Sequence, residues 1–256
     1  MSATPEARPH LERRPDYEPQ WDQERFIVPL LRSAIEKLLE AHAKLLAGKA
    51  LDVGCGKQPF RATLEAFGFS YTGMDMQAAE GVAHVAPIDG TLPSDLLAEG
   101  PFAFVLCTEV LEHVADWHAA FDNFEKLTSP GGKVLLTCPH VYPLHEEPFD
   151  FWRPTPHAIR HYAERAGFRV VSLDKLGDAW DVIGTTLGAC TISRGEWSWR
   201  ARIAAWFVRR LVRTTYFLLR KGWFLRSVPL GSKLYLSNVA ILEKSSPASS
   251  DFESVP

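Results

Sequence analysis

Residues 50–60 read ALDVGCGKQPF, a pattern that predicts a buried strand ending in a glycine turn before a helix. Gly54 and Gly56 have no Cβ atom, so the backbone there can lie close to a bound ligand. Asp75 follows Gly54 by 21 residues, at the end of a second apolar run. A carboxylate in this place is typical of the acid that binds a ribose in a dinucleotide-type βαβ unit. The two landmarks together predict a pocket for a nucleotide-like ligand.

Short apolar runs alternate with helical stretches along the rest of the chain. Helical spacing runs from Phe26 to Leu46, and Thr155 with Pro156 begins another helix that ends at Gly167. This alternation predicts an α/β fold, in which helices cover both faces of a mostly parallel, doubly wound sheet and ligands bind at the carboxyl ends of the strands. We predict strands at 50–53, 70–74, 83–86, 102–107, 133–138, 168–173 and 234–243.

Length and composition favour one domain with an elaboration. The chain has 256 residues, 46% of them hydrophobic, and a net charge of -3, which is enough apolar material for a substantial core. We expect a flexible segment at 1–20, a domain at 21–244 and a flexible tail at 245–256, because both ends are rich in proline, serine or charge.

The cysteines and the N-terminus bear on the compartment. The four cysteines lie far apart with no CxxC pair, which argues against a disulfide framework or a zinc site. The first residues contain no apolar signal core, and the chain contains no run of about 18 apolar residues. We therefore expect a cytoplasmic location, with peripheral attachment to the inner face of a membrane as an alternative.

Five landmarks, in order, resemble the class I S-adenosylmethionine-dependent methyltransferases, specifically the type 11 group. They are the 52–56 loop, Asp75, and the segments 88–93, 102–114 and 130–136. The resemblance covers residues 45–173 and implies a Rossmann-like, seven-stranded sheet with an antiparallel last strand and S-adenosylmethionine as cofactor. Many members have a third glycine where this chain has Gln58, which leaves the loop shape open. A dinucleotide reductase would need glycine at position 59, where Pro59 stands.

The resemblance also implies roles around the cofactor. Asp75 would accept hydrogen bonds from the ribose hydroxyls, and Asp89 from the adenine amino group. The alternatives are that the glycines only shape a turn, that Asp89 is a solvated turn residue, and that Asp52 orients the loop instead of contacting the methionine ammonium group. The predicted cofactor-binding residues are Asp52, Gly54, Cys55, Gly56, Asp75, Met76, Asp89, Gly90, Thr108 and Glu109.

Methyl transfer from a sulfonium needs positioning, and it needs a base only when the acceptor is a poor nucleophile such as a hydroxyl. The proline-rich segment 138–156 follows a strand end, where substrate loops belong, and it resembles the acceptor-side loop of type 11 enzymes from surface-glycan pathways. We predict His145 as the general base, with His113 as a second catalytic residue. The predicted substrate-loop residues are His140, Asp150, Trp152 and Arg153. In the alternative interpretation these side chains only hold the loop together.

The E-x-x-E-H spacing after the fourth predicted strand is similar to the magnesium motif of small-RNA 3′-end methyltransferases and ubiquinone-pathway O-methyltransferases. Carboxylates suit Mg²⁺, but the same letters occur widely in members without an evident metal, so we predict no metal. The alternative is Mg²⁺ held by Glu109, Glu112, His113 and His145. A further alternative is that Glu112 and His113 only line the pocket.

The segment 174–232 is longer than one connecting helix requires, and we predict a basic, aromatic helical insertion. Residues 194–226 contain eight arginines and one lysine against the single acid Glu196. On a helix over 202–221, a stripe of arginines lies opposite an apolar side, with Trp206 and Phe217 between the arginines. The stripe is Arg202, Arg209, Arg213 and Arg220, and the apolar side is Ala204, Phe207, Val208, Leu211, Val212, Leu218 and Leu219.

Such a helix suits peripheral membrane contact through 196–226, and on charge alone it suits RNA. The third alternative is that it packs its apolar side on the sheet. We predict a methyltransferase acting on oxygen or nitrogen of a small-molecule or glycan acceptor, including a lipid-linked one. The alternatives are an RNA 2′-O-methyltransferase and a non-catalytic cofactor-binding scaffold acting through the basic helix. The residues leave the acceptor's identity and the oligomeric state open.

Overall fold

The computed structural model describes residues 17–190, 198–222, 225–230 and 233–245. Most of the two predicted flexible ends, and Arg194 and Glu196 of the basic segment, lie outside these residues. Among the described helices, none is long and apolar enough to cross a membrane.

Seven strands form one sheet in the order β3-β2-β1-β4-β5-β7-β6. The first five in this order run parallel to one another, and β7 lies antiparallel between β5 and β6. This arrangement confirms the predicted doubly wound sheet and its antiparallel last strand. The strands are β1 Gly48–Val53, β2 Phe69–Asp75, β3 His84–Val85, β4 Phe102–Thr108, β5 Thr128–Pro139, β6 Phe168–Leu176 and β7 Ser237–Lys244.

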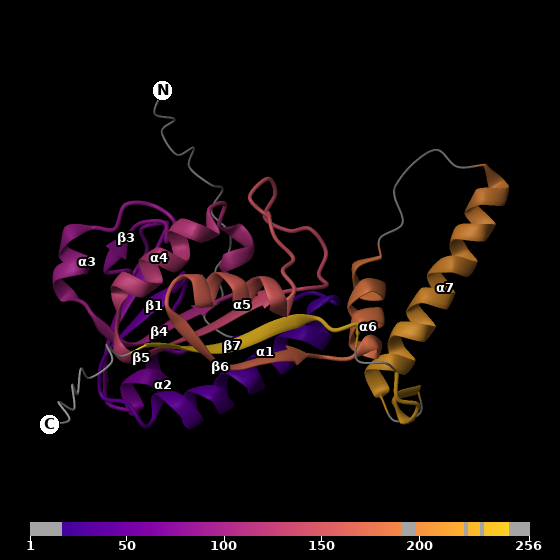
Figure 1. Ribbon diagram of the computed structural model, residues 1–256. Coiled ribbons are helices and arrows are strands. Elements are labelled where there is room, and N and C mark those ends of the chain that lie inside the picture. Colours follow the sequence, from indigo (N-terminus) through magenta and orange to yellow (C-terminus); the bar gives the residue numbers. More distant parts are fainter. Residues whose placement is uncertain (1–16, 191–197, 223–224, 231–232, 246–256) are drawn as a thin grey trace, which may run out of the picture.

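Helices cover both faces of the sheet, as predicted (Figure 1). Trp117, Phe121 and Ile159 pack on one face, from α4 and α5, and Ile35 and Leu64 pack on the other, from α1 and α2. The helices are α1 Glu24–Leu38 with the π-turn η1 Leu39–Ala43, α2 Arg61–Ala66, α3 Ser94–Glu99, the 3-10 turn η2 Leu111–His113, α4 Trp117–Leu127, α5 Pro156–Arg165, α6 Ala179–Ala189, α7 Trp199–Lys221 and the 3-10 turn η3 Leu225–Ser227.

Several element boundaries differ from the predicted ones, and two of these differences have a local reason. Strand β5 begins at Thr128 instead of residue 133, because a register irregularity in its pairing with β4 carries the strand through Gly131, whose φ is 73°. Helix α1 begins at Glu24, whose carboxylate accepts the backbone N–H groups of Gln20 and Trp21 at 2.7 and 3.1 Å. The helix predicted after Thr155 is confirmed, with the Thr155 hydroxyl accepting from Ala158 N–H.

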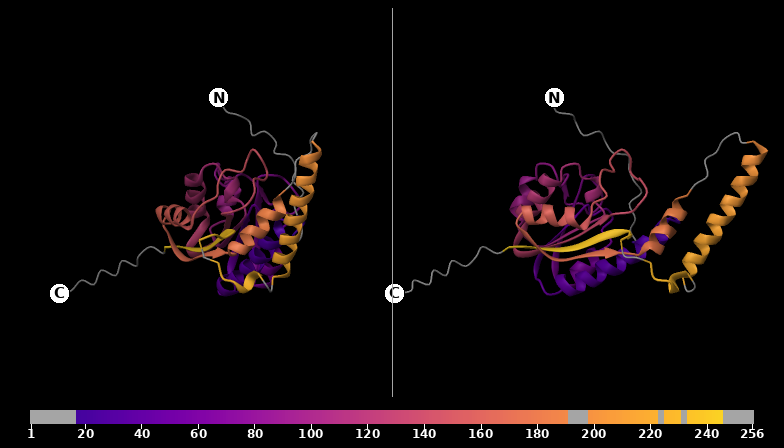
Figure 2. Two further views of the ribbon diagram at one scale, coloured as in Figure 1. Left: turned by 90° about the vertical axis from the view of Figure 1, so that its right-hand side faces the viewer. Right: turned by 45° about the vertical axis from the view of Figure 1, so that its right-hand side comes forward.

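The predicted insertion is helical, but α7 packs against α6 at one side of the molecule and not on the sheet (Figures 1 and 2). Of the apolar side predicted for this helix, Leu219 is buried and Val212 is half-buried, while Phe207, Leu211 and Leu218 are exposed. The alternative in which the apolar side packs on the sheet is therefore wrong for the described residues.

Candidate functional site

The loop after β1 is shaped by its glycines. Gly54 has a φ of 70°, and a Cβ atom there would lie 2.3 Å from Cγ2 of Val110. Both the left-handed backbone and the close contact disfavour a side chain at this position. Gly56 has a φ of 52° and donates its N–H to Oδ2 of Asp75 at 3.1 Å. Asp75 is thereby tied to the loop, although it stands on the neighbouring strand β2.

Gln58 occupies the position where a third glycine was expected. Its φ is 60°, so it adopts the left-handed conformation that glycine takes most easily. Its side-chain amide donates to the carbonyl of Glu80 at 3.0 Å, which ties the strained residue to the segment after β2. The loop therefore keeps a glycine-like path despite the substitution.

A cavity of about 490 Å³ opens at the carboxyl ends of β1 and β4. Helix α1 lies beside it and contributes Ile27, Val28 and Leu31 to its wall. We refer to its two ends as the glycine-loop end, with Asp52, Gly54, Cys55 and Gly56, and the histidine end, with Glu109, Glu112, His113 and His145.

Of the remaining predicted cofactor residues, some line the cavity and others lie outside it. Thr108 lines the cavity, whereas Asp75 does not line it but accepts a hydrogen bond from Gly56, which does. Met76 is exposed and is not among the residues that line the cavity. Asp89 and Gly90 line a separate depression, and Oδ2 of Asp89 accepts the backbone N–H of Asp116 at 3.2 Å.

Asp52 is a buried carboxylate at the glycine-loop end. Its Oδ2 accepts the Tyr71 hydroxyl at 2.8 Å. Burial raises the pKa of Asp52 to about 7, and the Tyr71 hydrogen bond offsets only part of this shift. A cationic group in the cavity would favour the charged form.

Two further carboxylates lie at the histidine end, Glu112 fully buried and Glu109 half-buried. Desolvation raises the pKa of Glu109, against hydrogen bonds from Thr137 and Ser237. Burial and then the proximity of Glu109 raise the pKa of Glu112 well above its ordinary value. Glu112 is fully buried, and its Oε1 has no hydrogen-bond partner among the described residues. Such an atom is costly unless a proton, a ligand or an ion satisfies it.

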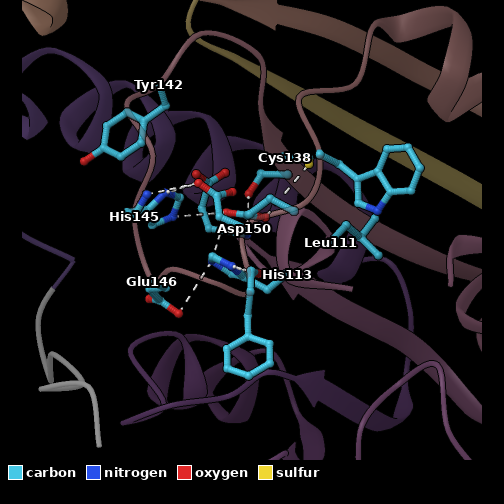
Figure 3. Close-up of polar contacts among 12 residues, drawn as sticks. Leu111, His113, Cys138, Tyr142, His145, Glu146 and Asp150 are labelled. Carbon is cyan, nitrogen blue, oxygen red and sulfur yellow. Dashed lines mark hydrogen bonds and ion pairs between the residues drawn. The ribbon is translucent and has the colours of Figure 1, made fainter. Parts of the chain in front are cut away.

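The two predicted catalytic histidines meet at this end, one from η2 and one from the loop after β5 (Figure 3). Their ring centroids lie 4.8 Å apart. Nε2 of His113 and Nε2 of His145 lie 3.8 and 3.9 Å from Oε1 of Glu112. Nδ1 of His113 lies 2.9 Å from the carbonyl oxygen of Phe149, which orients the ring. One ligand atom each from Glu112, His113 and His145 lies within 4.8 Å of the other two.

His145 is held by the loop from which it projects. Its backbone N–H donates to Oδ2 of Asp150 at 3.0 Å, and its Nδ1 lies 3.2 Å from the same oxygen. Burial, followed by the proximity of His113, lowers the pKa of His145. The lowered pKa favours the neutral form of the ring.

The other substrate-loop residues make contacts within the protein. Arg153 donates to both oxygens of Asp150 at 2.6 Å and to the carbonyls of Tyr142 and Pro143. His140 stacks on Tyr235 at 4.3 Å. Trp152 donates from Nε1 to the carbonyl of Val114 at 2.8 Å. This geometry matches the alternative in which these side chains hold the loop.

Sequence reasoning missed several residues that shape the cavity. Tyr17, Glu18 and Trp21 close it from the N-terminal side, and Tyr142 and Glu146 close it from the loop. No chemical motif marks these positions in the sequence. The signal that could have identified them is that they are close in sequence to the predicted helix or to His145.

Comparison with known sequences identifies the domain. A family model described as a methyltransferase domain (Methyltransf_23) matches residues 23–173. The chain is 32% identical over 130 residues to proteins named ubiquinone biosynthesis O-methyltransferase, from Pseudomonas aeruginosa (strain LESB58) and from Chromobacterium violaceum. Each match covers 46% of this chain and 56% of the relative, so the chain spans little more than half the length of these curated relatives.

Solved structures share the fold at low sequence identity. The cyclase SpnF superposes with a TM-score of 0.52 at 13% identity, covering 89% of this chain and 97% of that one. A Bacillus halodurans C-125 protein has a TM-score of 0.51 at 13% identity, covering 84% and 100%. One of these proteins is named a cyclase, so the likeness shows the fold and not the reaction.

Proposed function

Because this chain belongs to the class I S-adenosylmethionine-dependent methyltransferases, we propose that it transfers the sulfonium methyl group to an oxygen or nitrogen of a small-molecule or glycan acceptor, including a lipid-linked one. The observation that carries the proposal is the shape of the cavity. It joins the glycine loop, where the donor would bind, to a pair of histidines, where an acceptor proton could be removed.

The glycine-loop end suits the donor. In our proposal Asp75 accepts hydrogen bonds from the ribose hydroxyls and keeps its hydrogen bond from Gly56. Asp52 faces the methionine ammonium group, whose charge would compensate the cost of a buried carboxylate. Thr108 lines the cavity next to Glu109, which belongs to the histidine end. The adenine would extend beyond this cavity, where it would meet Met76, Asp89 and Gly90.

The histidine end suits an acceptor that must lose a proton. A hydroxyl becomes a competent nucleophile only as its proton leaves, and a neutral imidazole can accept that proton. The lowered pKa of His145 favours its neutral form, and Asp150 orients the ring, so we propose His145 as the base. His113 completes the pair. The names of the curated relatives, which specify O-methyltransferases, favour oxygen over nitrogen as the acceptor atom.

The experiment supplies the full chain with S-adenosylmethionine labelled on the methyl group, in separate reactions with a lipid extract, a glycan fraction and total RNA. Label in the glycan or lipid fraction is the expected result. Label that nuclease treatment releases from RNA would replace the acceptor with nucleic acid. Binding of S-adenosylhomocysteine without label in any fraction would instead favour the non-catalytic scaffold.

A second candidate adds a divalent cation at the histidine end. Oε1 of Glu112 has no hydrogen-bond partner in the part of the chain that the structure describes, and it lies close to two histidines. Glu112, His113 and His145 would hold such an ion, with Glu109 as the fourth ligand of the predicted set. When bound, the ion would act as a Lewis acid that lowers the pKa of an acceptor hydroxyl. The test is calorimetric titration of the full chain with Mg²⁺ and with Mn²⁺, before and after Glu112→Gln. Heat that the variant abolishes supports the ion, whereas no heat, together with unchanged turnover in EDTA, excludes it.

A further inference from the structure

Helix α7 presents large apolar side chains to solvent. Leu211 and Phe207 are 68% and 62% exposed, although a helix of a globular protein normally turns such residues inward. Val212, Tyr216 and Leu219 face the rest of the molecule, so the helix already has a packed side and the exposed residues form another. We name as the α7 surface the exposed residues Trp199, Ile203, Trp206, Phe207, Leu211, Phe217 and Leu218.

A stripe of positive charge borders the α7 surface. Helix α7 contains no acidic residue, and no ion pair involves its arginines among the described residues. Trp206 and Phe217 lie between the stripe and the aliphatic residues. Arg210 approaches the ring of Trp206 at 5.7 Å, and Lys221 approaches the ring of Phe217 at 5.6 Å. The stripe is Arg202, Arg209, Arg213 and Arg220.

We propose that α7 docks in the plane of an anionic phospholipid surface. An interfacial helix has aliphatic and aromatic residues that enter the acyl boundary, with arginines beside them at the level of the phosphates. The long arginine side chains can keep their charge at the headgroups while their stems cover apolar surface. Both parts of this pattern are exposed on α7, and the charge of the stripe complements anionic lipid.

The same features count against RNA and against a second copy of the chain as the partner of the α7 surface. RNA would neutralise the arginines, but it would leave Ile203, Leu211 and Leu218 in water, since phosphates and bases do not cover aliphatic side chains. A second copy of the chain could cover these residues, but it would bring two arginine stripes of the same sign together with no acid on either helix.

The docked helix would lie beside the cavity. The Tyr216 hydroxyl donates to the carbonyl of Asp22 at 3.0 Å, and its ring meets Phe26 edge-on at 5.6 Å. Trp21, next to Asp22, lines the cavity. In Figure 1, α7 stands on the side of the molecule toward which the parallel strands point. If the proposed function holds, a lipid-linked acceptor would therefore approach the cavity from the surface on which α7 rests.

The experiment is co-sedimentation of the full chain with two kinds of vesicle, one of phosphatidylcholine alone and one containing phosphatidylglycerol. We expect binding to the anionic vesicles that weakens at high salt. The charge variant Arg209→Gln/Arg213→Gln should weaken it by about fivefold for each arginine removed. The apolar variant Phe207→Ser/Leu211→Ser should weaken it by about tenfold or more, because both side chains would otherwise leave water.

The matched controls are Arg160→Gln on α5 and Leu45→Ser, which change an exposed arginine and an exposed leucine elsewhere. Both should bind vesicles as the wild type does. Calorimetry with S-adenosylhomocysteine tests whether the α7 variants keep the cofactor site. Vesicle binding requires no turnover, so a failure of this proposal can be told apart from a failure of the proposed function.

Three results would overturn the proposal. The first is equal sedimentation of wild type and apolar variant with anionic vesicles. The second is binding of a single-stranded RNA oligonucleotide that the apolar variant keeps, without vesicle binding. The third is a concentration-dependent dimer in light scattering that the apolar variant abolishes, again without vesicle binding.

Discussion

At the glycine-loop end of the cavity the shape comes from backbone, whereas at the histidine end it comes from side chains of segments far apart in the sequence. Gly54 and Gly56 lie within one turn and are tied to the adjacent strand by backbone N–H groups. Glu112 and His145 belong to η2 and to the loop after β5, and Oε1 of Glu112 has no hydrogen-bond partner within the described part of the chain. The difference indicates a donor site that is formed in advance and an acceptor site that a ligand completes.

The largest effect should come from the histidine end. His145→Gln removes the proposed base and should lower kcat for label transfer by about 10²- to 10⁴-fold, while the dissociation constant of S-adenosylhomocysteine stays unchanged. His157→Gln, which changes an exposed histidine on α5, is the matched control. Loss of cofactor binding in His145→Gln would contradict our division of the cavity into a donor site and a separate acceptor site.

At the glycine-loop end, Gly54→Ala should lower the free energy of unfolding by about 2 to 4 kcal/mol, the sum of left-handed strain and the Val110 contact. Cofactor binding should be lost with it, as measured by calorimetry and by urea unfolding. Gly68→Ala is the control, because its φ is 90° and a Cβ there meets nothing within 4 Å. Equal stability losses in the two variants would show that the Val110 contact is unimportant.

A smaller loss is expected from Asp75→Asn. The amide cannot accept from both ribose hydroxyls and from Gly56 as the carboxylate does, so affinity for S-adenosylhomocysteine should fall by about 1.5 to 3 kcal/mol, the range for hydrogen bonds to a charged group. Asp174→Asn changes an exposed aspartate on β6 and should bind as the wild type does. An unchanged dissociation constant in Asp75→Asn would remove Asp75 from the site.

The mildest test uses pH. Because the pKa of Asp52 is about 7, cofactor affinity should weaken as pH falls below 7, by at most about tenfold per pH unit for one proton. Asp52→Asn should abolish this slope. Tyr71→Phe removes a hydrogen bond that lowers the pKa, so the slope should begin at higher pH. Calorimetry at several pH values measures all three, and a slope that survives Asp52→Asn assigns the titration to another group.

The stability of the ligand-free protein should respond in the opposite direction. The pKa of Asp52 is raised in the folded chain, so its contribution to stability is present at low pH and is lost as pH rises through about 7. Urea unfolding of wild type against Asp52→Asn isolates this contribution, and the difference between the two should grow with pH.

Much of the fold could be predicted because its signals are local. The seven strands, the antiparallel last strand and the helix after Thr155 follow from apolar periodicity, from turn residues and from a family resemblance carried by short motifs. The candidate cofactor loop was equally accessible, since Gly54 and Gly56 are required by backbone conformation within a few residues. Gln58 shows the limit, because only the folded chain reveals that a glutamine takes the conformation of a glycine.

The sequence by itself determined the order of strands along the chain, the glycine turn and the spacing to Asp75, since each depends on neighbours in the chain. Only the tertiary structure decided which carboxylates lose their water, that His113 and His145 share one space, and that Phe207 and Leu211 of α7 remain exposed. The physical reason is that desolvation and contact depend on segments brought together by packing, and periodicity along one helix cannot say which of its sides another element will cover.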